Sequence, residues 1–182
     1  MASHESTDED AFNSVGSEMV IRNAGMVILW PFFTRLFEEL YFIKNNEFVD
    51  NKSRNRSVYV LQQLVYNSID FSEYELVLNK LFVGLPLTNH LSPISELTTE
   101  EIDLCSSLLH GLIFNWDKVK NSSPKAIQET FLKRDGFLKI KEDAMTLRIE
   151  KKGVDVLLNS LSWNISLIKL GWMEKPLHVE WI

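Results

Sequence analysis

Hydrophobic positions are densest in a stretch that starts at Ala24. No charged residue occurs from Ala24 to Phe33, and apolar residues then recur at the i, i+3, i+4, i+7 and i+8 spacing of one helix face. An uncharged run of this length is far short of the about 20 residues that a membrane-spanning helix needs. The pattern therefore predicts a helix at the centre of the core. Pro31 suits the first position of that helix, and the alternative is a kinked helix that starts near Ala24.

The helical period continues further along the chain. Two capping boxes, Ser72–Glu75 and Thr98–Glu101, each mark the start of a helix. Residues 85–97 contain Pro86 and Pro93 and are predicted to form a loop. The expected helices cover about 51–67, 73 to Gly84, about 99–118, Pro124 to Gly136, and a short segment after Gly153.

The period changes from 3.6 to 2 after Gly136. Apolar and polar residues alternate through Leu138–Ile140 and again through Met145–Ile149, which predicts a β-hairpin near 137–150 that turns at Glu142–Asp143. The segments 163–168 and 177–181 are compatible with either strands or irregular core. We therefore expect a mainly α fold with a small β-hairpin (α+β), arranged as a compact multi-helix domain.

The N-terminal residues differ in composition from the rest. Residues 1–20 carry five acidic side chains and no lysine or arginine. Such a segment buries too little apolar surface to offset its ordering entropy. We expect 1–20 to be a disordered acidic tail and 21–182 to form a single helical domain.

Composition and charge limit the classes of function. The chain has 182 residues, 45% of them hydrophobic, with a formal net charge of −6. A net negative charge disfavours binding to nucleic acid or to anionic membranes. The lone Cys105 excludes an internal disulfide, and the chain does not open with a secretory signal pattern. A cytoplasmic protein is the expectation.

Few residues suggest chemistry. The histidines are scattered, and Cys105 lies on the apolar stripe of a predicted helix, where a small buried hydrophobe is the expected role. Two S-x-x-K matches, at Ser122 and Ser166, lack the supporting motifs, and no glycine-rich loop is present. We expect no catalytic, cofactor-binding or metal-binding residues and no enzymatic activity.

Three C-terminal tryptophans form a regular series. Trp163, Trp172 and Trp181 follow one another at intervals of nine. Core packing explains such residues without a further role. The alternative is a partner-docking surface, since tryptophan is enriched at the energetic centres of interfaces.

Several stretches of the chain carry a resemblance to a known family. They are Asn23–Phe33, Leu78–Leu81, Gly84–Leu87, Glu129–Leu132 with Arg134 and Gly136, Leu147–Glu150, Asp155–Leu158, Leu161–Trp163, Ile168, Trp172–Met173 and Leu177–Trp181. Together they resemble the tape measure proteins of contractile injection systems, which are bacterial phage-tail-like machines. The similarity covers Asn23 to Trp181 in the same order, and the chain departs from the family pattern at Ser162 and Gly171, where proline is usual.

The resemblance implies a structural component that assembles with other tail proteins. The implied partners are tail tube, baseplate or spike, and cap proteins, with an oligomer possible within the particle and no nucleic acid. It implies assembly in the bacterial cytoplasm, in a particle that is then released or anchored. The alternative is a free-standing helical adaptor or regulatory protein without enzymatic activity. A separate expectation follows from the prolines and glycines that interrupt the helices, because a chain so divided does not form one long ruler.

Overall fold

A mixed β-sheet forms one side of the domain in the computed structural model, which describes residues 17–182. The strand order is β1-β4-β5-β7-β6. Neighbouring strands run antiparallel except β5 and β7, which are parallel. The strands are β1 (Glu18–Ile21), β4 (Gly136–Ile140), β5 (Met145–Ile149), β7 (Leu177–Trp181) and β6 (Leu167–Ile168).

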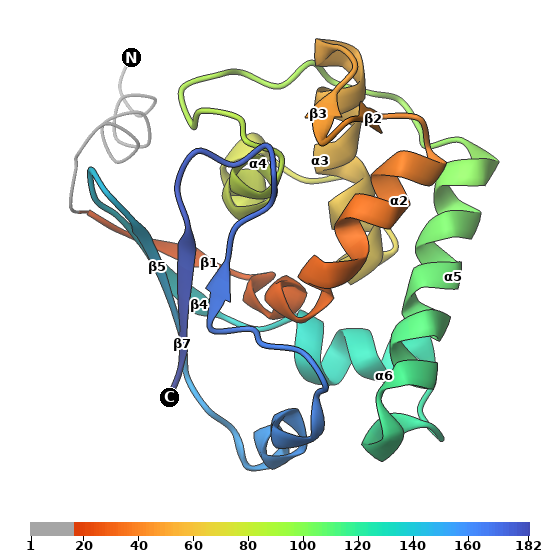
Figure 1. Ribbon diagram of the computed structural model, residues 1–182, viewed down its shortest axis with the longest axis vertical. Coiled ribbons are helices and arrows are strands. Elements are labelled where there is room, and N and C mark those ends of the chain that lie inside the picture. The colour runs from red at the N-terminus through yellow and green to blue at the C-terminus, as the bar shows by residue number, and fades with distance from the viewer. Residues whose placement is uncertain (1–16) are drawn as a thin grey trace, which may run out of the picture.

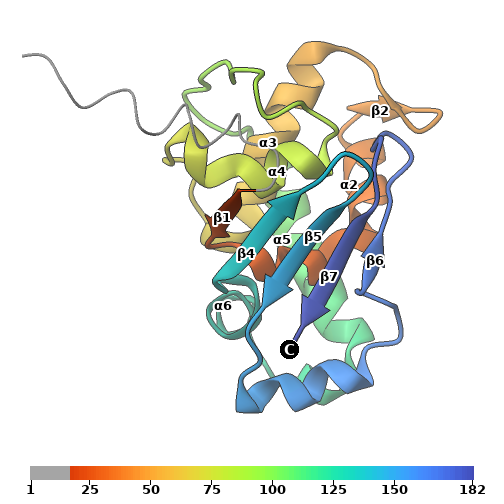
Figure 2. The ribbon, with the colours of Figure 1, turned by 90° about the vertical axis from the view of Figure 1, so that its left-hand side faces the viewer.

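One face of this sheet packs on the helices, as seen from the edge of the sheet in Figure 1. Leu138 of β4, Leu147 of β5 and Val179 of β7 point toward the helices and are buried. The residues next to each of them in its strand point outward. No helix of the described residues covers the outer face in Figure 2. The alternation that predicted the hairpin therefore reflects one buried and one open face.

The central hydrophobic run is helical from its first residue. Ala24–Phe32 forms the 3-10 helix η1, which passes directly into helix α2, Phe33–Glu39. Met26 to Leu29 are fully buried, so over these residues every side of the helix faces protein, whereas Pro31 near its end is exposed. Of the two sequence interpretations, the kinked helix that starts near Ala24 is the one observed, with Pro31 inside it.

The remaining helices surround η1 and α2, and several begin where the sequence predicts. Asp50 caps α3 by accepting a hydrogen bond from the Ser53 N–H (2.6 Å), and both capping boxes are formed. The apolar stripe of α5 is not buried along its whole length, since Ile102 in the first turn is 42% exposed. The helices are α3 (Asn51–Tyr66), η2 (Glu73–Leu76), α4 (Val77–Phe82), α5 (Thr99–Asn115), η3 (Asp117–Val119), α6 (Pro124–Ile127), the π-helix η4 (Gln128–Leu132) and the 3-10 helix η5 (Gly153–Ser160).

The expected fold class, mainly α with a small β-hairpin, is wrong because the chain forms much more β-sheet than one hairpin. The predicted hairpin is present as β4 and β5, but it is the middle of a five-stranded mixed sheet, and β2 (Ile43–Lys44) and β3 (Glu47–Phe48) form a second, two-stranded sheet. The fold is α+β with a substantial sheet. The strands β1 and β6 are too short to show a period, and β5, the parallel partner of β7, is not its neighbour in sequence.

The predicted acidic tail overlaps the sheet at its end. Glu18–Val20, assigned to the tail from composition, lie in β1 and pair with β4. Residues 1–16 lie outside the described residues. The sheet therefore begins before the segment 21–182 that the sequence predicts as the domain.

Two backbones approach very closely at Gly25. A Cβ atom added at this glycine would lie 1.7 Å from the carbonyl oxygen of Phe131, in the π-helix η4. No side chain fits there unless the backbone of one helix moves. Gly25 thus determines how closely η1 packs on η4.

Gly25→Ala is expected to lower the free energy of unfolding by more than about 3 kcal/mol, because the methyl group overlaps a backbone carbonyl. Urea denaturation of purified protein measures the change. Gly153→Ala is the matched control, since a Cβ at Gly153 meets no atom within 4 Å. Equal stability of the two variants would show that η1 and η4 are not packed as described.

Candidate functional site

A buried ion pair connects the sheet to the helical layer. Arg134 donates from Nη1 and Nη2 to the two carboxylate oxygens of Asp155, each at 2.7 Å. The two side chains are 1% and 0% exposed. Arg134 Nη2 also donates to the carbonyl oxygen of Glu150 (3.0 Å). Asp155 Oδ2 accepts hydrogen bonds from the backbone N–H of Lys152 (2.7 Å) and from Trp181 Nε1 (2.9 Å).

These groups come from four separate places in the chain, and we call them the C-terminal clasp. Arg134 follows η4, Glu150 follows β5, Asp155 lies in the first turn of η5, and Trp181 ends β7. The guanidinium group of Arg134 also lies over the Trp181 ring, 5.4 Å from its centre. The clasp therefore forms only when the last strand, η5 and the end of η4 are all in place.

The carboxyl group of Asp155 is held in its charged form. Burial alone raises the pKa of this group, but the hydrogen bonds from Arg134, the Lys152 N–H and Trp181 outweigh burial, so its pKa lies below the ordinary value. A buried carboxylate with its bonds satisfied in this way is a structural element and has no spare proton to exchange.

The other two tryptophans of the series also bind inside the domain. Trp163 donates from Nε1 to the carbonyl oxygen of Ile28 (2.9 Å) and packs edge-on against Phe32. Trp172 donates to the carbonyl oxygen of Phe82 (2.7 Å), and its ring contacts Phe37 and Phe48.

Each of Trp163, Trp172 and Trp181 is half-buried and contacts a different part of the domain. All three thus attach the C-terminal segment to the core. Their partner-docking role stays a prediction, and it would use only the exposed part of each ring.

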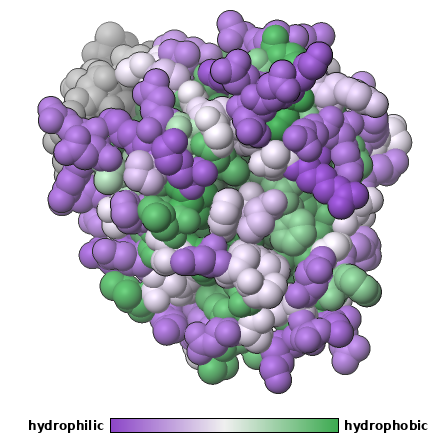
Figure 3. All heavy atoms as spheres, in the orientation of Figure 1, coloured by the Kyte–Doolittle hydropathy of each residue, from purple (hydrophilic) through white to green (hydrophobic). Residues whose placement is uncertain are grey.

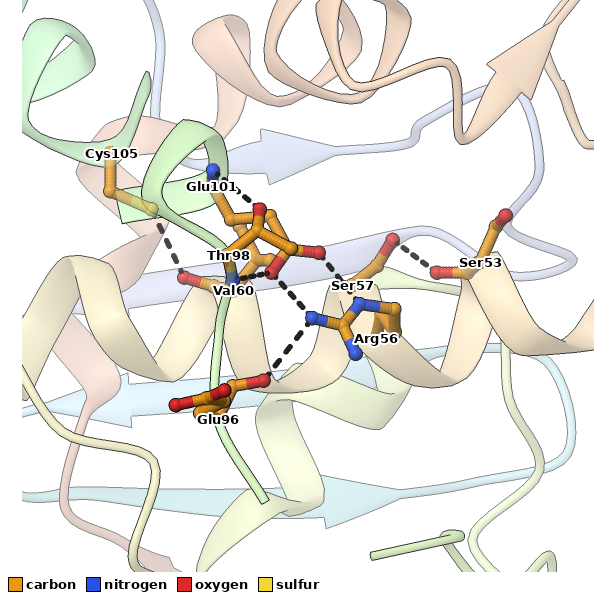
Figure 4. A network of polar contacts seen from close by, with 8 residues as sticks. All are labelled: Ser53, Arg56, Ser57, Val60, Glu96, Thr98, Glu101 and Cys105. Carbon is orange, nitrogen blue, oxygen red and sulfur yellow. Dashed lines mark hydrogen bonds and ion pairs between the residues drawn. The ribbon is translucent and has the colours of Figure 1, made fainter. Parts of the chain in front are cut away.

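A second polar network joins α3 to the start of α5, and Figure 4 shows it. Arg56 forms two hydrogen bonds with the carboxylate of Glu101, at 2.7 and 2.6 Å. Glu101 also accepts from the backbone N–H of Thr98, which completes the capping box (2.7 Å). This network fixes the first turn of α5 against α3.

Cys105 lies one turn further along α5, behind this network. Its Sγ donates to the carbonyl oxygen of Val60 (3.6 Å), and burial raises the pKa of the thiol to about 12. The raised pKa favours the protonated, neutral form of this buried thiol. The sequence interpretation of Cys105 as a small buried hydrophobe agrees with this environment.

Sequence analysis did not identify the buried Lys80. This lysine, 2% exposed, pairs with Glu73 and donates to the carbonyl oxygen of Asn89 (2.8 Å). Glu73 in turn accepts from the Leu91 N–H (3.1 Å). The pair therefore holds the 85–97 loop on α4. A signal was available, since Lys80 lies in a predicted helix between the apolar runs Leu76–Leu78 and Leu81–Val83.

The described residues do not contain the cluster of ligating side chains that a metal site needs. His90, His110 and His178 are exposed, and His4 lies outside the described residues. Within residues 17–182 no group of three or more His, Cys, Asp or Glu side chains is placed to hold a metal ion. No helix in that range is long and apolar enough to cross a bilayer.

Asp155→Asn is expected to lower the free energy of unfolding by about 3 kcal/mol at neutral pH, because Arg134 then stays buried without a charged partner. The folded-state pKa of Asp155 is lowered, so its stabilisation is fully present above the unfolded-state pKa of about 3.9 and is lost as pH falls through the folded-state pKa. The difference in the free energy of unfolding between wild type and Asp155→Asn should thus become smaller below about pH 4. Chemical denaturation across a pH series measures it.

Asp117→Asn is the matched control, since Asp117 pairs with Lys120 on the surface. This variant should have wild-type stability at neutral pH. A charged, paired Asp155 would be contradicted by one result. In it, the difference in the free energy of unfolding between wild type and Asp155→Asn does not change with pH down to the range of acid unfolding.

The whole chain matches one protein family. The family model described as contractile injection system tape measure protein matches residues 1–181. Neither a curated protein nor a solved structure gives a significant match. Residues that carried the resemblance, among them Gly25, Arg134, Asp155 and Trp181, are those that pack the described domain together. The chain belongs to the contractile injection system tape measure protein family.

Proposed function

We propose that this chain is a structural assembly subunit of a contractile injection particle and acts as a single domain that docks to tube, baseplate or cap proteins. The observation that carries the proposal is the family match over residues 1–181. The role is non-enzymatic, and the particle is assembled in the bacterial cytoplasm. No membrane or nucleic acid partner is part of the proposal.

We further propose that the chain does not set tube length by its own extension. Its longest helix, α5, has 17 residues and spans only about 26 Å. A folded chain of this size has a radius of gyration of about 16 Å, whereas 182 residues in one helix would span about 270 Å. The hydrogen bonds of Arg134 with Asp155 and of Trp163 with Ile28 join residues that are distant in sequence, which supports a folded domain in place of an extended one.

The variant Trp172→Ala distinguishes a role of Trp172 in packing the domain from a role in docking to tail proteins. Because the ring contacts Phe37 and Phe48 and its N–H bonds to Phe82, the variant is expected to lose about 3–5 kcal/mol of stability. Denaturant unfolding and pull-down of tail proteins are measured on the same samples. Near wild-type stability with specific loss of tail-protein binding would instead assign Trp172 to the docking surface.

A length test uses the loop between α4 and α5. Thirty helix-forming residues are inserted after Ser95, beyond the residues that Lys80 and Glu73 hold. A ruler would lengthen the tube by about 45 Å, whereas a docking subunit leaves tube length unchanged. Electron microscopy of particles from cells that carry the altered gene measures tube length.

The matched control is an insertion of the same length in Gly/Ser residues at the same place. It should give the same tube length as the helical insertion. Lengthening in proportion to the helical insertion would contradict the proposal.

A further inference from the structure

Helix α5 presents an unusually apolar residue to solvent. Its buried face includes Cys105, Leu109 and Leu112, and the opposite face points away from the domain. Phe114 lies on that outer face with 78% of its surface exposed. Isolated exposed apolar residues are common, so Phe114 becomes informative only through its surroundings.

A groove lies between α2 and α5, and its lining includes Gly111 and Asn115, which are close to Phe114 in the sequence. Its volume is about 230 Å³, below the 300–1,000 Å³ typical of small-molecule sites, and it is open to solvent. Apolar side chains line it from both helices, and polar residues form its rim. The apolar residues are Phe32, Leu36, Leu104 and Leu108, and the rim residues are Arg35, Glu39, Ser107 and Asn115.

Gly111 lies in the wall of this groove, in the middle of α5. A glycine there lowers helix stability relative to alanine. A Cβ at Gly111 would meet no atom within 4 Å, so packing inside the domain does not require glycine. A missing side chain on an open helix face does permit the close approach of another backbone.

The charged residues along α5 indicate which kind of partner fits this surface. Asp103 is exposed near the N-terminal end of the helix, and Lys118 is exposed just past its C-terminal end, in η3. Neither forms an ion pair within residues 17–182, whereas Arg35 and Glu39 on the groove rim pair with each other. The surface is therefore not suited to a strongly acidic or basic partner. It is complementary to a copy of itself that runs in the opposite direction.

When α5 of one copy crosses α5 of a second copy antiparallel at Gly111, apolar residues of the two copies also meet. Phe114 lies three residues after Gly111 and Leu108 three residues before it, so Phe114 of one copy faces the groove wall of the other. Lys118 of each copy then lies at the end of α5 that carries Asp103 in the other. Opposed helix dipoles favour the same orientation.

We propose that two copies of this chain associate through α5, antiparallel and two-fold symmetric, with Phe114 of each copy inserted into the groove between α2 and α5 of the other. Such an interface is isologous, since one patch binds itself. The face that carries α2 and α5 is a mosaic of hydrophilic and hydrophobic residues in Figure 3, as is usual for interfaces that are not permanent.

Sedimentation velocity of the full-length chain, from about 1 to 200 µM, tests the proposal. Wild type is expected to dimerise in this range, and Phe114→Asp is expected to weaken dimerisation by about tenfold or more. Tyr74→Asp is the matched control, since Tyr74 is an exposed aromatic residue (60%) on η2 and lies outside the groove. It should dimerise like wild type.

Charge reversal tests the orientation. Lys118→Glu alone should weaken dimerisation, and Asp103→Lys combined with Lys118→Glu should restore it. Gly111→Leu should also weaken dimerisation, while its melting temperature as a monomer stays at or above that of wild type, because the site is open within one copy.

A wild-type chain that stays monomeric at 200 µM, or a Phe114→Asp variant that dimerises like wild type, would overturn the proposal. The same holds if the double reversal does not restore dimerisation. A monomeric wild type whose binding to another particle protein is lost in Phe114→Asp would assign the groove to that protein instead, and would likewise overturn it.

Discussion

The buried ion pair of Arg134 and Asp155 is the constraint on which the rest of the fold depends. Two charges removed from water are tolerated only when each has its hydrogen bonds satisfied. Here the partners come from the end of η4, the end of β5, the start of η5 and the end of β7. A partly assembled clasp would leave a charge buried and unpaired, so the C-terminal strand and the helical layer must form together.

The glycines explain why these elements can come close enough. Gly25 lets η1 lie against the backbone of η4, directly before Arg134. Gly84 ends α4 with a positive φ of 71° and leaves space for the backbone of Trp172. Residues of the family resemblance thus make contacts inside the domain, and the two glycines allow the closest of them.

Local signals predicted much of the fold, and long-range pairing was the part they missed. The capping residues Asp50, Ser72 and Thr98 mark helix starts because their hydrogen bonds involve neighbours in sequence. The parallel pairing of β5 with β7 joins residues about thirty apart in the sequence, and no pattern of neighbouring residues indicates it. The same is true of Arg134 and Asp155, which the sequence identifies as family residues but not as partners. The tryptophans were recognised, but the backbone carbonyls that they contact have no sequence signature.

Because the clasp joins the sheet to the helices, both are expected to unfold as one cooperative unit. Native-state hydrogen exchange measures this directly, because each amide reports the free energy of the opening that exposes it. The account predicts that Leu147 in β5 and Val179 in β7 exchange with the same, highest free energy as Leu61 and Leu64 in α3. Strand amides that exchange at a clearly lower free energy than those of α3, with the helices still protected, would contradict it.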